Sequence, residues 1–252
     1  MNPIVTVIIP TYNRADLLPQ AVKSVLSQTF TDFELLILDD SSTDNTHEVI
    51  KPFLNDSRVR YIYDPENKGI TANRNYGLGV SKGIYIAMLD SDDVWINDSK
   101  LQRQVEILDA HPEVGVVGTF SKKINAQGEV IGEITAKLAH SSIRRNMMFR
   151  NQLTQSSVLI RKEALDNVGW YDENIPIWED YELWLRIGLN YQLRNIPEFF
   201  TGYRVHEGNI SNLSKEKSIS AYTTIYQLYK KKYPFSSVLL GKILVKKFLL
   251  RL

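Results

Sequence analysis

The sequence comprises 252 residues, of which 43% are hydrophobic and 23% are charged, a mixture typical of globular proteins that argues against disorder and fibrous repeats. Its 30 Lys and Arg residues balance 29 Asp and Glu residues, so no overall basic charge indicates nucleic acid as a partner. Cysteine is absent, which excludes disulfides, thiolate metal sites and a cysteine nucleophile and suits a reducing compartment such as the cytoplasm.

The first half of the chain alternates between strand and helix patterns. Apolar runs predict strands over residues 5–9, 33–38, 59–63 and 84–89. The segments that begin near Asp16, Thr43 and Ile70 predict helices between these strands. This order predicts an α/β fold with a mostly parallel, Rossmann-like sheet and helices on both faces. In such sheets ligands bind beyond the carboxyl ends of the strands.

The second half predicts further elements of the same domain. These are a helix over 99–110, a strand over 114–118, a hairpin over 122–137, a short strand over 158–160, a helix over 181–189 and a closing segment over 191–203. The N-terminus lacks the basic segment of a signal peptide, and nowhere do 18 apolar residues run together. We therefore expect no signal peptide and no membrane span.

The charges are distributed unevenly along the chain. Residues 214–252 carry nine basic residues and one acidic residue, a net charge of +8, whereas residues 1–213 carry a net charge of −7. We therefore predict one domain over 1–213 and a helical basic tail over 214–252. The tail's last 15 residues predict an amphipathic helix, with Val238, Leu244, Val245, Phe248, Leu249 and Leu252 on one arc and lysines opposite.

Two roles are open for this tail. Its lysines could hold it on an anionic membrane surface, which would make the protein peripheral on the inner face of the membrane. Alternatively, the helix packs on the domain or in a dimer interface.

Polar clusters follow three of the predicted strands. Residues 10–14 follow the first strand, Asp39 and Asp40 the second, and Asp90 to Asp93 the fourth. We expect all three clusters to face one crevice. Carboxylates spaced like Asp90 and Asp92 can bind Mg²⁺ or Mn²⁺ together with phosphate oxygens. Alternatively, the acids form a solvated turn that caps the next helix.

Five motifs in order resemble the inverting glycosyltransferases of family 2, which have the GT-A fold. They are VIIPTYNR at 7–14, LDDSSTD at 38–44, NKG with ANRN at 67–75, LDSDD at 89–93 and WEDYELW at 178–184. The resemblance extends from residue 4 to about residue 210. It implies donor-binding roles for Pro10, Thr11, Tyr12, Arg14, Asp39, Arg74, Asp90, Ser91 and Asp92.

Within that set the resemblance implies particular contacts. Asp39 would hold the uracil edge of the donor, Thr11 would lie beside the nucleoside, and Arg74 would contact the base or a phosphate. Asp90 would lie near the ribose. Asp92, with His206, would hold a divalent metal, Mn²⁺ or Mg²⁺, on the diphosphate; a purely structural histidine is the alternative for His206.

The resemblance also implies that Asp180 is the catalytic base, with Glu179 as its orienting neighbour. The alternative for this acidic pair is a pair of helix-start residues favoured by the helix dipole. On the acceptor side we expect Trp95 and Trp178, together with Glu179, with Trp95 lining the pocket.

The sequence therefore predicts a metal-dependent inverting glycosyltransferase that moves a sugar from a nucleotide diphosphate, most simply a UDP-sugar, to a hydroxyl. The acceptor would be a glycan or lipid-linked saccharide in cell-surface polysaccharide synthesis. Processive members of the family carry a Gln-x-x-Arg-Trp motif, and its absence here predicts a single transfer.

Two other functions remain open. One is a sugar nucleotidyltransferase, although residues 10–14 lack the glycine of its phosphate loop. The other is a non-catalytic module that binds nucleotides or carbohydrates.

Overall fold

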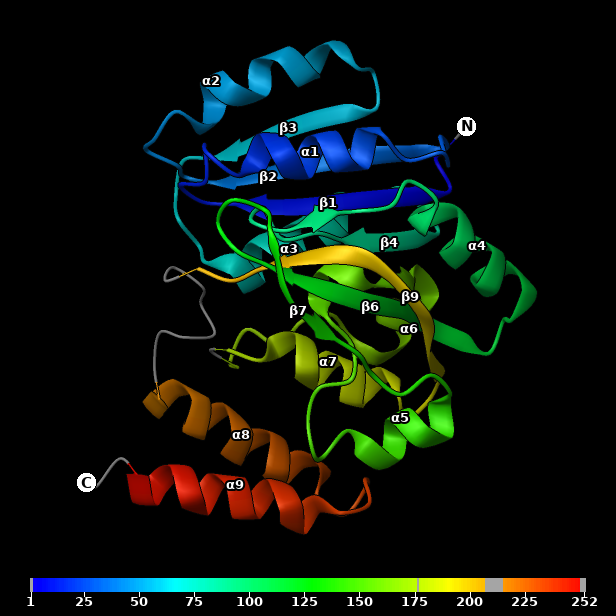
Figure 1. The fold of residues 1–252 in the computed structure, drawn as a ribbon, viewed down its shortest axis with the longest axis vertical. Coiled ribbons are helices and arrows are strands. Elements are labelled where there is room, and N and C mark those ends of the chain that lie inside the picture. Colours follow the sequence, from blue (N-terminus) through cyan, green and yellow to red (C-terminus); the bar gives the residue numbers. More distant parts are fainter. Residues whose placement is uncertain (1, 176, 207–214, 250–252) are drawn as a thin grey trace.

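The structure is a computed structural model that describes residues 2–175, 177–206 and 215–249 (Figure 1). Its first half contains β1 (Val5–Thr11), α1 (Leu18–Leu26), β2 (Phe33–Asp40), α2 (Thr46–Ile50), β3 (Val59–Asp64), α3 (Ile70–Val80), β4 (Tyr85–Met88), β5 (Val94–Trp95) and α4 (Lys100–Ala110). Its second half contains β6 (Val114–Ile124), β7 (Val130–Ile134), α5 (His140–Asn146), β8 (Leu159–Arg161), α6 (Lys162–Val168), α7 (Glu179–Ile187), β9 (Gln192–Arg204), α8 (Lys215–Tyr229) and α9 (Ser236–Leu249).

A single sheet organises these elements, with the strand order β3-β2-β1-β4-β8-β6-β9-β5 and β7 paired to β6. The strands β3, β2, β1 and β4 are parallel, whereas β8 is antiparallel to both β4 and β6. The predicted α/β fold is confirmed, but the sheet is mixed beyond β4, where β8 and β5 are antiparallel to their neighbours and β6 and β9 are parallel to each other. The β6 strand is also longer than expected, because it pairs with β9 along most of its length.

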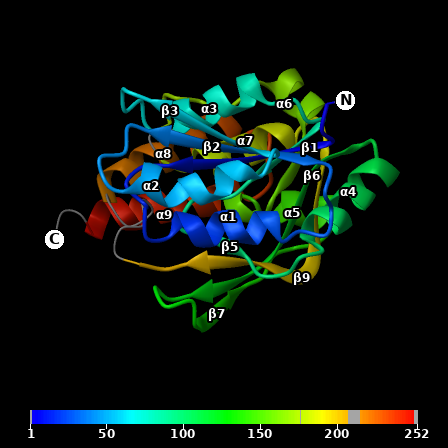
Figure 2. The same cartoon turned by 90° about the horizontal axis from the view of Figure 1, so that it is seen from above.

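The sheet separates two apolar cores. Alternate residues of β1 point to opposite faces, so that Ile8 joins one core and Val7 and Ile9 join the other. Helices α1 and α4 cover the face that carries Val7, and helices α3, α6 and α7 cover the opposite face (Figure 2). Because helices cover both faces of the sheet, a ligand can reach the strands only at their ends.

Helices α8 and α9 lie antiparallel to one another beside α7 (Figure 1). Their buried side chains, including Ile225, Leu239 and Ile243, belong to the same apolar core as Trp184 of α7. The Tyr233 hydroxyl also donates a hydrogen bond of 2.8 Å to the main-chain oxygen of Leu185. One side of the predicted tail therefore packs on the domain.

Another side of α9 is exposed. Leu244, Val245 and Phe248 of the predicted apolar arc are 57%, 58% and 63% exposed, respectively. Residues 207–214, where the predicted boundary between domain and tail falls, lie outside the described residues, as does Leu252 of the arc. In the described segments, no helix combines the length and hydropathy that crossing a membrane requires.

Burial of the α8 side chains predicts that the tail and the domain unfold together. We expect Ile225→Ala to lower the free energy of unfolding by about 2–4 kcal/mol, because Ile225 is fully buried. The matched control is Leu228→Ala on the same helix, which should change it by less than about 0.5 kcal/mol because Leu228 is 46% exposed. Urea denaturation followed by circular dichroism measures both values. Equal effects of the two substitutions would contradict shared burial.

Candidate active site

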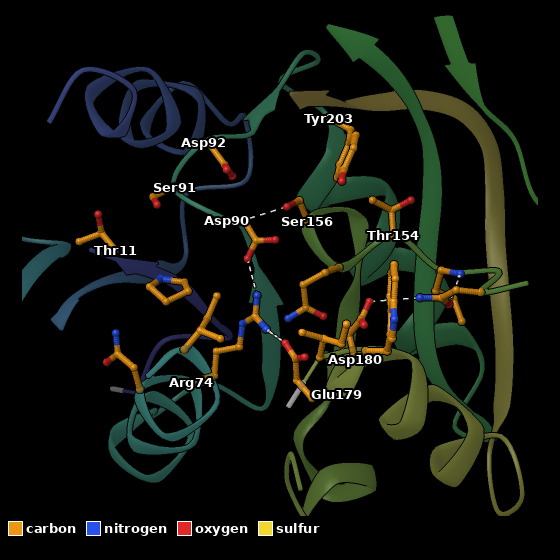
Figure 3. Close-up of a pocket in the computed structure, with 18 of the residues that line it drawn as sticks. Thr11, Arg74, Asp90, Ser91, Asp92, Thr154, Ser156, Glu179, Asp180 and Tyr203 are labelled. Carbon is orange, nitrogen blue, oxygen red and sulfur yellow. Dashed lines mark hydrogen bonds and ion pairs between the residues drawn. The ribbon is translucent and has the colours of Figure 1, made fainter. Parts of the chain in front are cut away.

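A cavity of about 850 Å³ lies beyond the carboxyl ends of β1, β2 and β4. Its wall contains most of the residues that the sequence indicated: Pro10, Thr11, Tyr12, Arg14, Arg74, Asp90, Ser91, Asp92, Trp178, Glu179 and Asp180. Asp92 and Asp180, which are 88 positions apart in the sequence, therefore face one space (Figure 3).

The second acidic cluster requires a correction. Asp40 lies in the cavity wall, whereas Asp39 does not. The Asp39 carboxylate is buried and accepts hydrogen bonds from the Tyr61 hydroxyl and, at 2.8 Å, from the backbone N–H of Ser42. The expectation that both acids face the crevice is thus corrected for Asp39, because consecutive residues of a strand point to opposite sides. A contact between Asp39 and a bound base stays a prediction.

Asp40 fixes the start of α3. Its two carboxylate oxygens accept hydrogen bonds of 2.9 Å from the backbone N–H groups of Lys68 and Gly69. Gly69 precedes the helix with φ at +85°, a conformation that favours glycine. This loop positions the helix that carries Arg74.

Arg74 is only 3% exposed and joins two carboxylates (Figure 3). One terminal nitrogen of its guanidinium forms an ion pair of 2.6 Å with Asp90, and the other forms an ion pair with Glu179. The sequence predicted that the Arg74 guanidinium contacts a base or a phosphate. In this structure its terminal nitrogens contact protein carboxylates instead. Arg74 ties the end of β4 to the beginning of α7.

The acidic motif after β4 divides between the wall and the interior. The Asp92 carboxylate lies 2.9 Å from Nε2 of His206, so the two residues expected at the metal are adjacent. Asp93 is buried, where it accepts hydrogen bonds from the Ser156 hydroxyl and from the backbone N–H of Arg204. Burial raises the pKa of Asp93 well above its usual range, and the neighbouring acids raise it further. Asp93 therefore anchors the motif, a role that its position as a third acid did not reveal.

Asp92 and His206 could supply two ligands of a divalent ion, whose remaining ligands would come from a bound molecule. Among the described residues, no group of three or more His, Cys, Asp or Glu side chains is arranged to hold a metal by itself. A carboxylate and an imidazole supply an oxygen and a nitrogen donor, of which the carboxylate oxygen is the type that suits Mg²⁺ and Mn²⁺.

Asp180 has the properties of a proton acceptor. Its pKa is raised to about 7, first by burial and then by the negative charge of Glu179, while Arg74 opposes the shift. The amide of Asn151 donates a hydrogen bond of 3.1 Å to its carboxylate. Asn151 was not predicted, because it lies in a segment without a recognisable motif.

The two tryptophans differ in position. Trp178 lies in the cavity wall, with a positive φ of 66°, and its ring stacks on Tyr222 of α8 at 5.7 Å between centroids. Trp95 is 4% exposed and lies outside the wall, so the expectation that it lines the pocket is wrong. Its indole N–H donates to the Ser156 main-chain oxygen, and the Lys100 amine lies 4.1 Å from its ring centroid.

Four buried polar atoms of the wall have no hydrogen-bond partner among the described residues: Oγ1 of Thr11, Nε of Arg74, Oε1 of Gln155 and Nε1 of Trp178. Most buried polar groups in proteins are hydrogen-bonded, so atoms of this kind are suited to contact a polar ligand. Thr11 was expected to contact a ligand, and Gln155 adds a residue that the sequence did not single out.

Comparison with known proteins gives a consistent result. Residues 6–169 match the sequence profile of Glycosyl transferase family 2. The chain is 33% identical, over 82% of its length and 80% of the relative, to the UDP-Glc:alpha-D-GlcNAc-diphosphoundecaprenol beta-1,3-glucosyltransferase WfaP of Escherichia coli. It is 27% identical to the putative colanic acid biosynthesis glycosyl transferase WcaA of E. coli K12, over 94% of this chain and 85% of that one.

Solved structures share the fold. S. aureus TarS 1-349 in complex with UDP-GlcNAc aligns with a TM-score of 0.77 at 21% identity, over 98% of this chain and 73% of that chain. The mannosyltransferase PcManGT of Pyrobaculum calidifontis, in complex with GDP-Man and Mn²⁺, aligns with a TM-score of 0.71 at 18% identity, over 96% and 70% of the respective chains.

Proposed function

Because the chain belongs to glycosyl transferase family 2 and is a glycosyltransferase, we propose that it transfers one sugar per encounter from a UDP-sugar to a hydroxyl of a lipid-linked saccharide, with inversion. The observation that carries the proposal is a carboxylate of raised pKa, Asp180, in the same cavity wall as Asp92, whose carboxylate contacts His206. An acceptor held at Asp180 and a nucleotide diphosphate held near Asp92 would lie in the same cavity.

The choice of a uridine donor is supported by similarity. TarS was solved with UDP-GlcNAc, and the name of WfaP gives UDP-Glc as its donor. PcManGT binds GDP-Man, so a guanosine donor is the competing choice. The unpartnered hydroxyl of Thr11 at the end of β1 is available to either nucleoside.

Asp180 would act as the general base. Its carboxylate takes the proton of the acceptor hydroxyl while the oxygen attacks the anomeric carbon. The bond to the nucleotide diphosphate breaks as the new glycosidic bond forms on the opposite face, so the anomeric configuration inverts. Asn151 would orient the carboxylate through the hydrogen bond that it donates.

Asp92 and His206 would hold a divalent metal, for which Mn²⁺ is our choice. When bound, such a cation offsets the negative charge that develops on the leaving diphosphate. The Mn²⁺ in the PcManGT complex supports this proposal.

Removal of either donor should weaken metal binding. We expect Asp92→Asn or His206→Ala to raise the Mn²⁺ concentration needed for half-maximal transfer by about 10-fold or more. Binding of Mn²⁺ to the UDP complex, measured by isothermal titration calorimetry, should weaken in parallel. The control is Asp172→Asn, which changes an acid outside the cavity wall. Unchanged Mn²⁺ affinity in both variants would exclude this pair as the metal site.

The acceptor proposal is supported by the names of two relatives. The acceptor in the name of WfaP is a saccharide on a diphosphoundecaprenol lipid, and the name of WcaA refers to polysaccharide synthesis. We propose a corresponding acceptor here, with the protein at the inner face of the cytoplasmic membrane. The exposed apolar side chains of α9, Leu244, Val245 and Phe248, support contact with a lipid surface.

A panel of nucleotide sugars tests the whole proposal. We expect one UDP-sugar to raise the melting temperature in the presence of Mn²⁺ and to be slowly hydrolysed without an acceptor. A sugar 1-phosphate with UTP should release no pyrophosphate, which separates this enzyme from a sugar nucleotidyltransferase. Stabilisation without turnover towards any acceptor would instead support a binding module.

The raised pKa of Asp180 predicts the pH dependence. Because the base must be unprotonated, kcat/KM should fall about tenfold per pH unit below pH 7. Glu179→Gln removes a negative charge that raises this pKa. The acidic limb of the profile of kcat/KM against pH should therefore move to lower pH. Glu198→Gln, at an exposed ion pair with Arg103, is the control and should leave the limb in place. If Glu179→Gln leaves the acidic limb of kcat/KM in place, a group other than Asp180 controls the rate in that pH range.

A further inference from the structure

Three cations from two distant parts of the chain lie near one another, and one of them lies in the cavity wall. Arg150 lies in the cavity wall. Lys242 of α9 donates a hydrogen bond to the main-chain oxygen of Phe149, the residue immediately before Arg150. Lys246 follows one helical turn later on α9, and its amine lies 5.1 Å from the ring centroid of Tyr222. We call Arg150, Lys242 and Lys246 the cationic rim.

The cationic rim has no counter-charge within the part of the chain that the structure describes. None of its three residues forms an ion pair there with a carboxylate. The pKa of Lys242 is lowered, first by burial and then by the positive charges of Lys246 and Arg150. An anion bound among neighbouring cations offsets their repulsion and stabilises their charged forms.

The rim adjoins the residues around Asp180. Arg150 precedes Asn151, which donates a hydrogen bond to the Asp180 carboxylate. Lys246 contacts Tyr222, whose ring stacks on Trp178, two positions before Asp180. An anion on the rim would therefore lie on the side of the cavity where the acceptor hydroxyl must approach the base.

Apolar side chains lie next to the rim. Phe149 and Phe235 are 37% and 44% exposed, and their ring centroids are 5.6 Å apart. On α9, Leu244, Val245 and Phe248 are exposed on both sides of Lys246 in the sequence. Phosphate-binding cations beside exposed aromatic and aliphatic side chains match a ligand that joins a phosphate to a hydrocarbon chain.

We propose that Arg150, Lys242 and Lys246 bind the diphosphate of a lipid-linked acceptor, with its hydrocarbon chain along Phe149, Phe235 and the exposed side of α9. This inference rests on the proposed function and identifies how the acceptor is held. The positive charges also offset the repulsion between the acceptor's phosphates and the acidic residues of the cavity.

Binding of geranyl diphosphate to the full chain, measured by isothermal titration calorimetry with and without UDP and Mn²⁺, tests the subsite. We expect binding to persist when UDP is present, because the donor diphosphate would occupy a different place. Arg150→Gln, Lys242→Gln and Lys246→Gln should each raise the Kd by about 10-fold. Lys247→Gln is the matched control, since it removes the same charge from the next residue of α9 and should change the Kd less than about twofold. Displacement by UDP, or equal effects of Lys246→Gln and Lys247→Gln, would overturn the proposal.

Vesicles distinguish the acceptor's phosphates from ordinary anionic headgroups. The two vesicle types are phosphatidylcholine with a long-chain prenyl diphosphate, and phosphatidylcholine with phosphatidylglycerol at equal total charge. We expect the wild type to sediment more strongly with the first type, and Arg150→Gln to abolish that preference. Equal sedimentation with both types would show a general membrane contact and overturn the specific subsite.

Failure of this inference can be separated from failure of the proposed function. A wild type that transfers sugar, while the rim variants bind geranyl diphosphate normally, refutes the subsite alone. Binding that depends on the rim, in a chain that transfers no sugar from any nucleotide donor, supports the subsite and refutes the proposed function.

Discussion

Asp180→Asn should lower kcat for sugar transfer by about 10³-fold, because an amide cannot take the proton of the acceptor hydroxyl. The Kd for UDP with Mn²⁺ should change less than about twofold, since the Asn side chain has nearly the same size and Asp92 and His206 are intact. Initial rates with a radiolabelled donor measure the first effect, and isothermal titration calorimetry measures the second. Transfer at the wild-type rate would remove Asp180 from the mechanism.

The same variant should be more stable than the wild type at pH 8. The pKa of Asp180 is about 7 in the folded protein and 3.8 in the absence of perturbation, so between these values the folded state retains a proton that the unfolded state has lost. Stability contributed by this group is therefore present at low pH and is lost as the pH rises to 7. Asn carries no charge at any pH, so the melting temperature of Asp180→Asn should exceed that of the wild type at pH 8 and approach it near pH 4. This rise separates loss of the base from loss of the fold.

The parallel half of the fold could be predicted because each of its elements has a local signal. Val5 to Ile9 form an apolar run, and residues 18–26 show helical spacing, so strand and helix could be assigned without knowledge of their neighbours. The direction of β8 could not be predicted, because a strand of three residues carries no local signal for its partners or for its orientation beside them. Its antiparallel pairing with β4 and β6 depends on contacts between distant segments.

The candidate site shows the same division. Motif positions predicted which loops meet, but not the direction of each carboxylate, so Asp40 lies in the cavity wall whereas Asp39 lies behind it beside Tyr61. Trp95 was misplaced because its apolar ring is equally suited to a pocket and to a core. Asn151, Gln155 and Arg150 carry no motif, and only the folded chain brings them to the wall.

Arg74 lies between the acidic motif after β4 and the acidic start of α7. Its guanidinium contacts Asp90 and Glu179, whose side chains are 26% and 11% exposed. Without a cation, these two carboxylates and Asp180 would repel one another at low exposure to water. Neutralisation of this cluster is therefore a function that Arg74 performs before any ligand binds.

Arg74→Met should consequently lower the free energy of unfolding by about 3–5 kcal/mol, because it leaves carboxylates without their buried cation. Arg74 also opposes the rise in the pKa of Asp180, so the acidic limb of kcat/KM should move to higher pH in this variant, the direction opposite to that expected for Glu179→Gln. Arg103→Met is the control, since the Arg103 side chain is 48% exposed and its ion pair should contribute less than about 1 kcal/mol.

Should Arg74→Met fail to fold, Arg74→Lys gives the second measurement, because it keeps the charge while a single ammonium cannot reproduce the planar fork. We expect it to fold, with a smaller loss of stability and a smaller upward shift of the acidic limb. The double variant Arg74→Met/Glu179→Gln should recover part of the stability, because one of the two repelling acids is gone. Urea denaturation provides these free energies, and strictly additive effects of Arg74→Met and Glu179→Gln would contradict a direct ion pair. A structural arginine that acted only by packing would move the unfolding midpoint of Arg74→Met and leave the pH profile of transfer unchanged, so the two measurements together identify its electrostatic role.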